Sequence, residues 1–314
     1  MQIAASIKVF GITRGRTSAY NQESVGKRCG KEASVRVLFQ EVGTTKRRIL
    51  IWGKTYPELS AKYFETVCCG GVFEDTGQPV RLYPIPYRYL EGDGQFSKYQ
   101  WLSGVVEKNP KDSRPESYRI DCDSIELQEK VPTTADEWGK RSNYIFKNSG
   151  WQFDSVEALQ KAERAQGTSI GIIKPKSIDK IEVVTRPSDD KTTFEEKIRR
   201  LGEISEAKRK QLNLFTEATP PEMKSLAYLE DRIRIEWVCY GAGCKGHKMQ
   251  VLDWEVAELH RKHGDEKALQ KVREVCDLNE YATQFFLGNF YLHPTAFTIV
   301  GLWYPKRVRD LLFR

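Results

Sequence analysis

Two thiols and an imidazole lie close together in the C-terminal third of the chain. Four residues separate Cys239 from Cys244, two more lead to His247, and glycines stand at positions 241, 243 and 246. Sulfur and imidazole donors at this spacing suit a tetrahedral zinc ion. A structural zinc needs a fourth ligand, whereas a catalytic zinc would keep water there. The candidates for the fourth ligand are His260, Cys276, His293, Asp253 and the adjacent Cys68 and Cys69. Without metal, the segment would be a glycine-rich hairpin turn with two small buried cysteines.

Two carboxylates follow this loop. Asp253 and Glu255 flank Trp254 directly after a strand pattern, where metal-dependent nucleases often place acids, and they are therefore the candidate catalytic residues. Asp253 also stands where a helix N-cap belongs, and Glu255 falls in the first turn, where the helix dipole favours negative charge. No Glu-x-Lys follows to complete a nuclease-type triad, so helix capping is the better-supported interpretation.

A third group of residues interleaves cations with aromatic rings. Residues 54–57, 81–88 and 98–101 each combine Lys or Arg with Tyr or Trp, and residues 114–119 add two arginines. Arginine can bind phosphate, and Tyr or Trp can stack on an unpaired base. The predicted nucleic-acid contacts are Lys54, Arg81, Tyr83, Arg88, Lys98, Arg114 and Arg119. The alternative is an ordinary sheet with half-buried aromatic rings and Lys and Arg stems lying over them.

The positive charge of the chain is concentrated at its N-terminus. The net charge is +7; residues 1–48 hold ten Lys/Arg and three Glu, and the remainder is balanced. A basic segment attached to a neutral body is typical of a polyanion binder. A solvated tail that aids solubility is the alternative.

Composition excludes several classes of protein. The seven cysteines are an odd number and partly clustered, which favours a reducing cytosol over a disulfide scaffold. No apolar run reaches membrane-spanning length, and the N-terminus does not resemble a secretory signal. No Gly-x-Ser-x-Gly, Walker-type or Rossmann motif is present. We therefore expect a cytoplasmic protein that does not bind membranes.

The elements that would position these residues fall into two lobes. Short strand patterns at 48–52, 65–69, 80–83, 99–106 and 117–122 predict a small antiparallel sheet or barrel. Helix signals follow from 134 to 147 and from 154 to 167, and two strands are expected at 169–174 and 178–184. After a charged helix at 194–215, the pattern predicts a hairpin at 233–252, helices at 254–263 and 265–281, and strands at 285–290 and 296–303.

The order of these motifs resembles an uncharacterised family of bacterial proteins. The resemblance rests on residues 54–57, 65–68, 81–88, 98–101, 114–119 and 171–175, on the Cys/His loop with residues 253–255, and on 297–305. It covers roughly residues 48–305 and leaves out the basic segment. The resemblance implies no activity and assigns no site residues.

We therefore expect an α+β protein, with a mainly antiparallel β domain bearing appended helices and a smaller α+β lobe carrying a zinc-knuckle-like hairpin. The expected divisions are a basic extension (1–46), a β-rich domain (47–186), a charged linker helix (187–222) and the C-terminal lobe (223–314). The predicted function is binding of DNA or RNA with zinc in a structural role. A metal-dependent nuclease using Asp253 and Glu255 and a scaffold subunit that binds protein partners in a larger complex are the alternatives.

Overall fold

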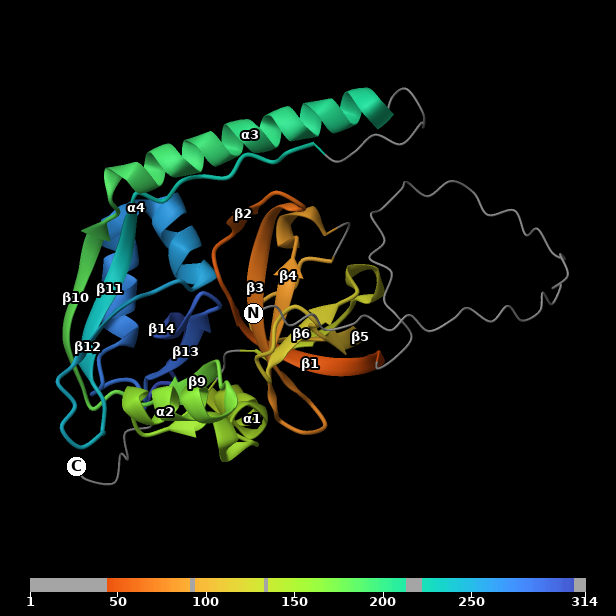
Figure 1. Ribbon diagram of the computed structural model, residues 1–314. Coiled ribbons are helices and arrows are strands. Elements are labelled where there is room, and N and C mark those ends of the chain that lie inside the picture. Colours follow the sequence, from red (N-terminus) through yellow and green to blue (C-terminus); the bar gives the residue numbers. More distant parts are fainter. Residues whose placement is uncertain (1–43, 91–93, 133–134, 213–221, 308–314) are drawn as a thin grey trace, which may run out of the picture.

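The computed structural model describes residues 44–90, 94–132, 135–212 and 222–307, and it is a mixed α+β structure (Figure 1). The predicted α+β class is confirmed. Strands predominate, and the described part contains four α-helices.

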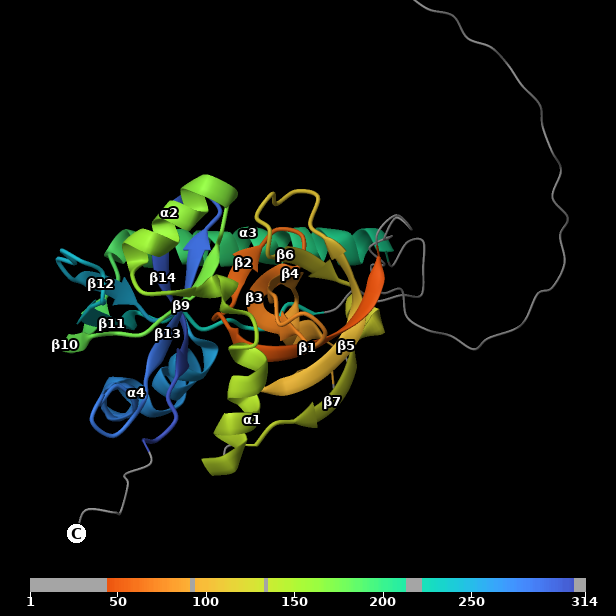
Figure 2. The ribbon, with the colours of Figure 1, turned by 90° about the horizontal axis from the view of Figure 1, so that it is seen from below.

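Five strands of the N-terminal half close into a ring, which we call the N-terminal barrel (Figure 2). They are β1 (Thr45–Lys54), β3 (Phe64–Phe73), β4 (Pro79–Ile85), β5 (Gln100–Lys108) and β6 (Ser117–Ile120). β1 pairs with β3 and β5, β3 with β4, and β5 with β6, all antiparallel, whereas β4 and β6 are parallel. The short β2 (Glu58–Ser60) pairs with β3, and β7 (Glu126–Lys130) with β5. The prediction of a small sheet or barrel is therefore confirmed as a barrel.

The alternation of side chains along β1 explains why its apolar run is fully buried. Ile49 and Ile51 point into the barrel core, whereas Leu50 and Trp52 belong to a second core that contains residues of both halves of the chain. Neighbouring residues of a strand face opposite sides. A run that is apolar on both sides thus predicts a strand covered on both faces.

The C-terminal half forms a second ring, the C-terminal barrel. Its strands are β9 (Ile170–Ile173), β10 (Ser177–Thr185), β11 (Asp231–Val238), β12 (His247–Gln250), β13 (Gln284–Phe290) and β14 (His293–Trp303). β10, β11 and β12 form one sheet, and β14, β13 and β9 lie in another with β8 (Gln152–Phe153). A parallel bridge from Val251 to Ile299 joins the two sheets on one side, and the short connection from β9 to β10 joins them on the other.

Both barrels have the same connectivity. Counting β9 and β10 as one bent strand, each ring runs first, second, third, fifth and fourth strand, with the third and fifth parallel. This arrangement is typical of the OB-fold, a five-stranded Greek-key barrel. The chain is therefore a tandem of two OB-like barrels.

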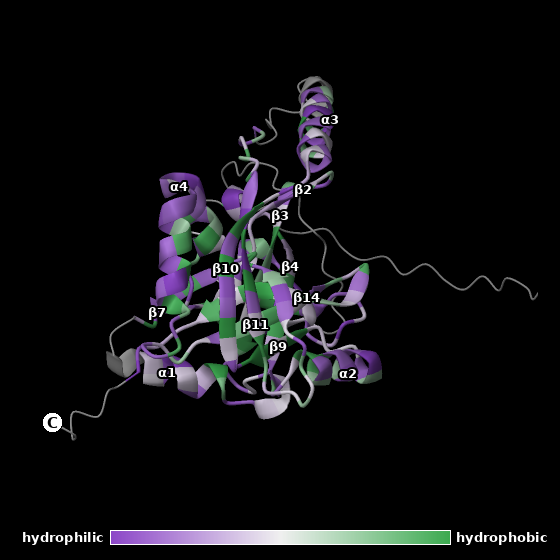
Figure 3. Ribbon diagram, turned by 90° about the vertical axis from the view of Figure 1, so that its left-hand side faces the viewer, coloured by the Kyte–Doolittle hydropathy of each residue, from purple (hydrophilic) through white to green (hydrophobic). Residues whose placement is uncertain are grey.

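The helices occupy the connections and the space around the barrels. α1 (Ala135–Ile145) and α2 (Val156–Gln166) lie on one side of the molecule, and α3 (Ser188–Leu212) crosses the opposite side (Figure 1). α3 is mostly hydrophilic, as Figure 3 shows. α4 (Trp254–Val275) connects the third and fourth strands of the C-terminal barrel and is interrupted at Gly264, where φ is 81°. The predicted helix break at this glycine is thus present.

Three short 3-10 turns complete the described elements, at Tyr87–Tyr89, Cys122–Ser124 and Ser149–Trp151. Among the described residues, no helix is both long and apolar enough to cross a membrane.

The end of the basic segment 1–48 belongs to a strand, and with it the last two residues of the predicted extension 1–46. Three cations of this segment lie in β1 and form ion pairs. Lys46 pairs with Glu126 and Arg47 with Asp75. Arg48 pairs with both Glu74 and Glu129. Residues 1–43 lie outside the described part of the chain.

The predicted domain division remains a prediction. β9 and β10 pair with β13 and β11, respectively. We therefore favour a boundary near residue 150 over one near residue 187. α3 then lies in a long loop between the first and second strands of the C-terminal barrel.

Candidate functional site

A cavity of about 520 Å³, which we call the interbarrel groove, lies between the two barrels. The N-terminal barrel lines it with β3, β4, the loop at 55–59 after β1, and Arg114 from the loop before β6. The C-terminal barrel adds β11, the β13–β14 hairpin and the first turns of α4, and residues of α3 and 227–229 also line the cavity. In OB-folds, the second and third strands and the loops after the first and fourth strands bind oligonucleotides. The groove uses the corresponding parts of the N-terminal barrel.

Positive side chains outnumber negative ones in this lining. The cations are Lys54, Arg81, Arg114, Arg186, Lys197 and Arg232, and the anions are Glu58, Asp190 and Asp231. Three of the cations form ion pairs: Lys54 with Glu255 (2.9 Å), Arg114 with Asp112 (2.5 Å) and Arg186 with Asp190 (3.2 Å). Within the described residues, Arg81, Lys197 and Arg232 take part in no ion pair. The lining therefore has more positive than negative side chains, with Glu116 and Asp112 near Arg81 and Glu58 and Asp190 near Arg232.

Arg81 is a buried cation whose hydrogen-bond acceptors are all neutral. Its Nη2 donates to the carbonyl oxygen of Ser169 (2.9 Å), and Nη1 donates to the carbonyl oxygen of Asn289 (3.3 Å) and contacts the Cys68 sulfur (3.7 Å). Its Nε has no hydrogen-bond partner in the described structure. Burial lowers the pKa of Arg81 because desolvation disfavours its charged form. Since buried charges are normally paired, this guanidinium favours a negatively charged ligand nearby.

Arg232 is the corresponding cation on β11. Its Nη1 donates to Oε1 of Gln250 (3.0 Å), which is neutral. Burial and the nearby Arg186 lower the pKa of Arg232. The two cations come from the second strand of one barrel and the third strand of the other, so both barrels contribute positive charge to the groove.

Aromatic rings of the groove reach solvent. Tyr83 on β4 is 36% exposed, and Phe290 and Tyr291 at the β13–β14 hairpin are 41% and 60% exposed. The Arg114 guanidinium lies 5.6 Å from the centre of the Tyr291 ring. Exposed rings beside cations provide surfaces on which unpaired bases can stack.

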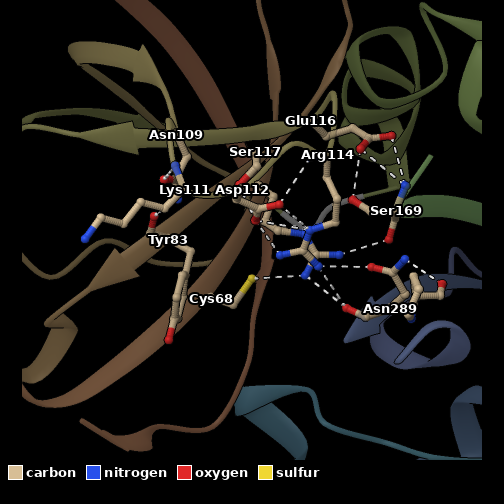
Figure 4. A network of polar contacts seen from close by, with 12 residues as sticks. Cys68, Tyr83, Asn109, Lys111, Asp112, Arg114, Glu116, Ser117, Ser169 and Asn289 are labelled. Carbon is tan, nitrogen blue, oxygen red and sulfur yellow. Dashed lines mark hydrogen bonds and ion pairs between the residues drawn. The ribbon is translucent and has the colours of Figure 1, made fainter. Parts of the chain in front are cut away.

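A polar network joins the two barrels next to the groove (Figure 4). Arg114 donates to Oδ1 of Asn289 (3.0 Å) and pairs with Asp112, which also accepts from Ser117 (2.7 Å). The buried Glu116 accepts from the hydroxyl of Ser169 at 2.9 Å. Arg114 is therefore part of the contact between the barrels as well as of the groove wall.

The remaining predicted contact residues form ion pairs within the protein. Lys98 pairs with Asp253 (2.9 Å), Arg119 lies 3.9 Å from Glu107, and Arg88 makes a two-pronged pair with Glu65. Arg88 also donates to the carbonyl oxygen of Ser225 at 2.8 Å. Of the seven predicted contacts, the groove brings together Lys54, Arg81, Tyr83 and Arg114. Arg88, Lys98 and Arg119 do not line it.

Asp253 and Glu255 lie where the start of α4 meets the N-terminal barrel. Asp253 is the N-cap of α4 and accepts from the backbone N–H groups of Glu255 and Val256. Its carboxylate is 1% exposed and pairs with Lys98, whereas Glu255 pairs with Lys54. Burial raises the pKa of Asp253 to about 6, against the opposing effect of Lys98. Burial also acts to raise the pKa of Glu255, but Lys98 and Lys54 lower it to about 2. Both acids thus form ion pairs between the barrels.

Cys239, Cys244, His247 and Glu157 form a cluster at the C-terminal end of β11, away from the groove. The His247 Nε2 lies 3.3 Å from the Cys239 sulfur and 3.2 Å from the Cys244 sulfur. Glu157, from the first turn of α2, places one carboxylate oxygen 3.6 Å from the Cys239 sulfur and the other 3.8 Å from His247 Nε2. The ligating atoms of these four residues all lie within 4.8 Å of one another. Neither His260 nor Cys276, the predicted fourth ligands, belongs to this group: His260 pairs with Asp265, and Cys276 lies in the hydrophobic core.

Sequence reasoning missed three kinds of site residue. Arg232 alternates with apolar residues, a pattern that predicts only a half-buried strand, and Glu157 has the position of an ordinary first-turn acid. The tip Phe290-Tyr291-Leu292 did carry a signal, because three consecutive large apolar residues between two strands are unusual for a solvent-exposed turn.

Comparison with known proteins gives a family but no activity. Among curated proteins, none matches this chain. A solved structure of a replication protein A heterotrimer bound to ssDNA is similar over 89% of this chain, with 11% sequence identity and a TM-score of 0.33. The match covers 52% of the solved chain, so this protein spans about half of its length. Residues 45–147 match the family model described as a domain of unknown function (DUF8758), and residues 152–314 match a second domain of unknown function (DUF8757). The predicted membership of an uncharacterised family is thereby confirmed, and the chain belongs to the DUF8757 family.

Proposed function

We propose that this protein binds single-stranded nucleic acid in the interbarrel groove. The observation that carries the proposal is the buried Arg81 at the oligonucleotide-binding face of an OB-like barrel, with neutral acceptors around it and no ion pair among the described residues. A nucleic-acid phosphate would compensate this charge.

The groove has the size of a ligand pocket. Pockets that bury drug-sized ligands have volumes of about 300–1,000 Å³. A volume of about 520 Å³ falls in this range. The exposed rings of Tyr83 and Tyr291 would stack on bases, which is feasible only where the bases are unpaired.

Cations of both barrels and of α3 would contact the phosphates. Arg81 comes from the N-terminal barrel, Arg232 from the C-terminal barrel, and Lys197 from α3. A strand bound by all three would cross from one barrel to the other. This path explains why the groove lies between the barrels rather than on one of them.

The test is fluorescence anisotropy of the full chain with a labelled single-stranded oligonucleotide of mixed sequence. We expect affinity to fall steeply as salt rises, since bound phosphates release counterions, and a duplex of the same length to bind more weakly. Binding that does not respond to salt, or a preference for the duplex, would contradict the proposal. Parallel DNA and RNA oligonucleotides determine which nucleic acid is preferred.

A metal-dependent hydrolase remains the second candidate, and one observation favours it. Asp231 and His260 line the groove and, with Asp265, form a cluster whose ligating atoms lie within 4.8 Å of one another. These residues, rather than Asp253 and Glu255, would hold a metal against a bound strand. Incubation of the labelled oligonucleotide with Mg²⁺ or Mn²⁺, followed by a denaturing gel, distinguishes the two functions. Cleavage abolished by Asp231→Asn would establish the hydrolase, and an intact oligonucleotide would exclude it.

The zinc predicted from the sequence in a structural role would lie away from this groove. β11 runs from Asp231 at the groove to Val238 beside the Cys/His loop. At about 3.3 Å per residue, the two ends are roughly 20 Å apart. Nucleic-acid binding and metal binding can therefore be tested separately.

A further inference from the structure

We infer that Glu157, Cys239, Cys244 and His247 together hold one zinc ion, which fastens the β11–β12 hairpin to the start of α2. Cys239 directly follows β11, Cys244 lies in the turn and His247 begins β12, while Glu157 comes from a helix about eighty residues earlier in the chain. The inference does not depend on nucleic-acid binding.

The distances between donor atoms agree with a tetrahedral ion. Zinc lies about 2.3 Å from sulfur and about 2.0–2.2 Å from nitrogen or oxygen, so tetrahedral donors of these kinds stand roughly 3.4–3.8 Å apart. Four of the six separations are 3.2 and 3.3 Å from His247 Nε2 to the two sulfurs, and 3.6 and 3.8 Å from the two oxygens of Glu157 to Cys239 and His247, and all the ligating atoms lie within 4.8 Å of one another. Few side-chain shifts would be needed to place an ion among them.

The four side chains bring their donor atoms to one place. A single nitrogen, His247 Nε2, faces both sulfurs. The Glu157 carboxylate then adds negative charge to the same place. A zinc ion would satisfy all four groups at once, because each offers a lone pair that zinc accepts.

The backbone brings the hairpin close enough to α2 for this set to form. Ser155 is the N-cap of α2 and accepts from Ala158 N–H (3.0 Å), which places Glu157 in the first turn. The backbone N–H of Tyr240 donates to the carbonyl oxygen of Asp154 at 3.2 Å. A Cβ at Gly241 would lie 2.6 Å from the Cβ of Ser155, so only glycine permits this approach.

The donor set points to a structural ion. Four protein ligands close a tetrahedral site, whereas a catalytic zinc keeps one position for water. The site joins the end of the hairpin to the helix that precedes β9, so metal binding would contribute to the stability of the C-terminal barrel.

The experiment measures zinc in the full chain purified without chelator. We expect about one zinc ion for each chain, in line with a single four-ligand site. Glu157→Gln should lower the affinity for zinc by at least about 10-fold in competition with a chromogenic chelator. The matched control is Glu163→Gln on the same helix, since Glu163 lies outside the cluster. Glu157 is 57% exposed at its side chain, so its replacement should not prevent folding.

Replacement of zinc by Co²⁺ reports the ligands directly. The full chain should show the visible absorption of tetrahedral Co²⁺ and a thiolate charge-transfer band that weakens in Cys244→Ser. A Cys122→Ser control should keep both bands, because Cys122 lies outside the cluster. A chain that holds no zinc and gives no tetrahedral Co²⁺ spectrum would overturn the site. Equal zinc affinities of Glu157→Gln and Glu163→Gln would overturn Glu157 as a ligand.

Discussion

At the scale of single residues, burial and pairing separate the cations of this protein into two groups. Lys98 and Arg88 have carboxylate partners and stabilise the fold, whereas the buried Arg81 and the half-buried Arg232 donate to neutral acceptors. A charge that is desolvated without a counterion is costly in free energy. Such a cost is understandable where an anionic ligand supplies the counterion.

The exposed ring of Tyr83 provides a prediction about base stacking. Tyr83→Ala should weaken binding of a single strand by about 1–3 kcal/mol, the usual contribution of one base stacked on an aromatic side chain. The control is Tyr240→Ala, because Tyr240 is also exposed (54%) but does not line the groove. Anisotropy titrations at one salt concentration measure both. Equal losses in the two variants would show that Tyr83 has no specific role.

Lys197 allows a test of the phosphate contacts that leaves the core untouched. It is exposed on α3, lines the groove and takes part in no ion pair within the described residues. Lys197→Gln should reduce the slope of log affinity against log salt by about 0.7, as expected when one phosphate contact on a single strand is lost. Arg199→Gln, on the same helix but outside the groove lining, should leave the slope unchanged. Identical slopes in the two variants would exclude Lys197 from the contact.

The sequence could bring together only residues that lie close to one another along the chain. The arrangement of Cys239, Cys244 and His247 within one hairpin was readable because nine residues contain all three. Glu157 was not predictable, since its approach to the hairpin depends on the packing of α2. Likewise, nothing near Lys98 in the sequence indicates that its partner is Asp253, 155 residues later.

At the scale of elements, strands and helices were predicted well and their pairing poorly. The strand patterns at 48–52, 65–69, 80–83, 99–106 and 117–122 each fall on a barrel strand, because period-2 burial and turn residues are local signals. The closure of β1 on β5 joins residues about 55 positions apart and has no local signal. The second barrel was missed for the same reason, although its strands were expected.

A close approach between two strands explains a glycine of the N-terminal barrel. A Cβ at Gly70 would lie 2.1 Å from Cζ2 of Trp52, whose ring is buried and stacks on Phe286 at 4.3 Å. Gly70→Ala should therefore destabilise the protein by about 1–3 kcal/mol, the cost of overpacking a core. Urea denaturation measures the change.

Gly202 is the matched control for this substitution. It lies within α3, and a Cβ there would meet no atom within 4 Å. Gly202→Ala should be neutral or stabilise the protein by up to about 1 kcal/mol, because alanine favours helix. A Gly70→Ala protein as stable as the parent would show that Trp52 can move aside.

At the scale of the whole molecule, the two barrels are held together by apolar and polar contacts. A hydrophobic cluster containing Leu50, Trp52 and Phe286 spans both halves of the chain. The network around Arg114 and Asn289 lies beside the groove, and the ion pairs of Asp253 and Glu255 join α4 to the N-terminal barrel. The groove is therefore shaped by the relative position of the barrels. Substitutions that weaken these contacts should affect both stability and binding.

The pair between Lys54 and Glu255 makes this interbarrel contact dependent on pH. Lys98 and Lys54 lower the pKa of Glu255 from 4.5 to about 2 in the folded protein, although burial opposes them, and Asp253 shares the same site. A depressed folded-state pKa stabilises the protein above the unfolded value of 4.5, and this contribution is lost as the pH falls toward 2. Since the Glu255 side chain is 42% exposed, solvent screening limits the contribution to about 1 kcal/mol.

Glu255→Gln should therefore be less stable than the parent protein at neutral pH by about 1 kcal/mol, and this difference should shrink as the pH falls below about 4.5. Urea denaturation at several pH values measures it. Glu266→Gln, an exposed acid of the same helix with no ion pair among the described residues, should show no such convergence. A difference between Glu255→Gln and the parent that stays constant over this range would mean that the carboxylate acts through packing rather than charge. The Lys54 pair would then not contribute to holding the barrels together.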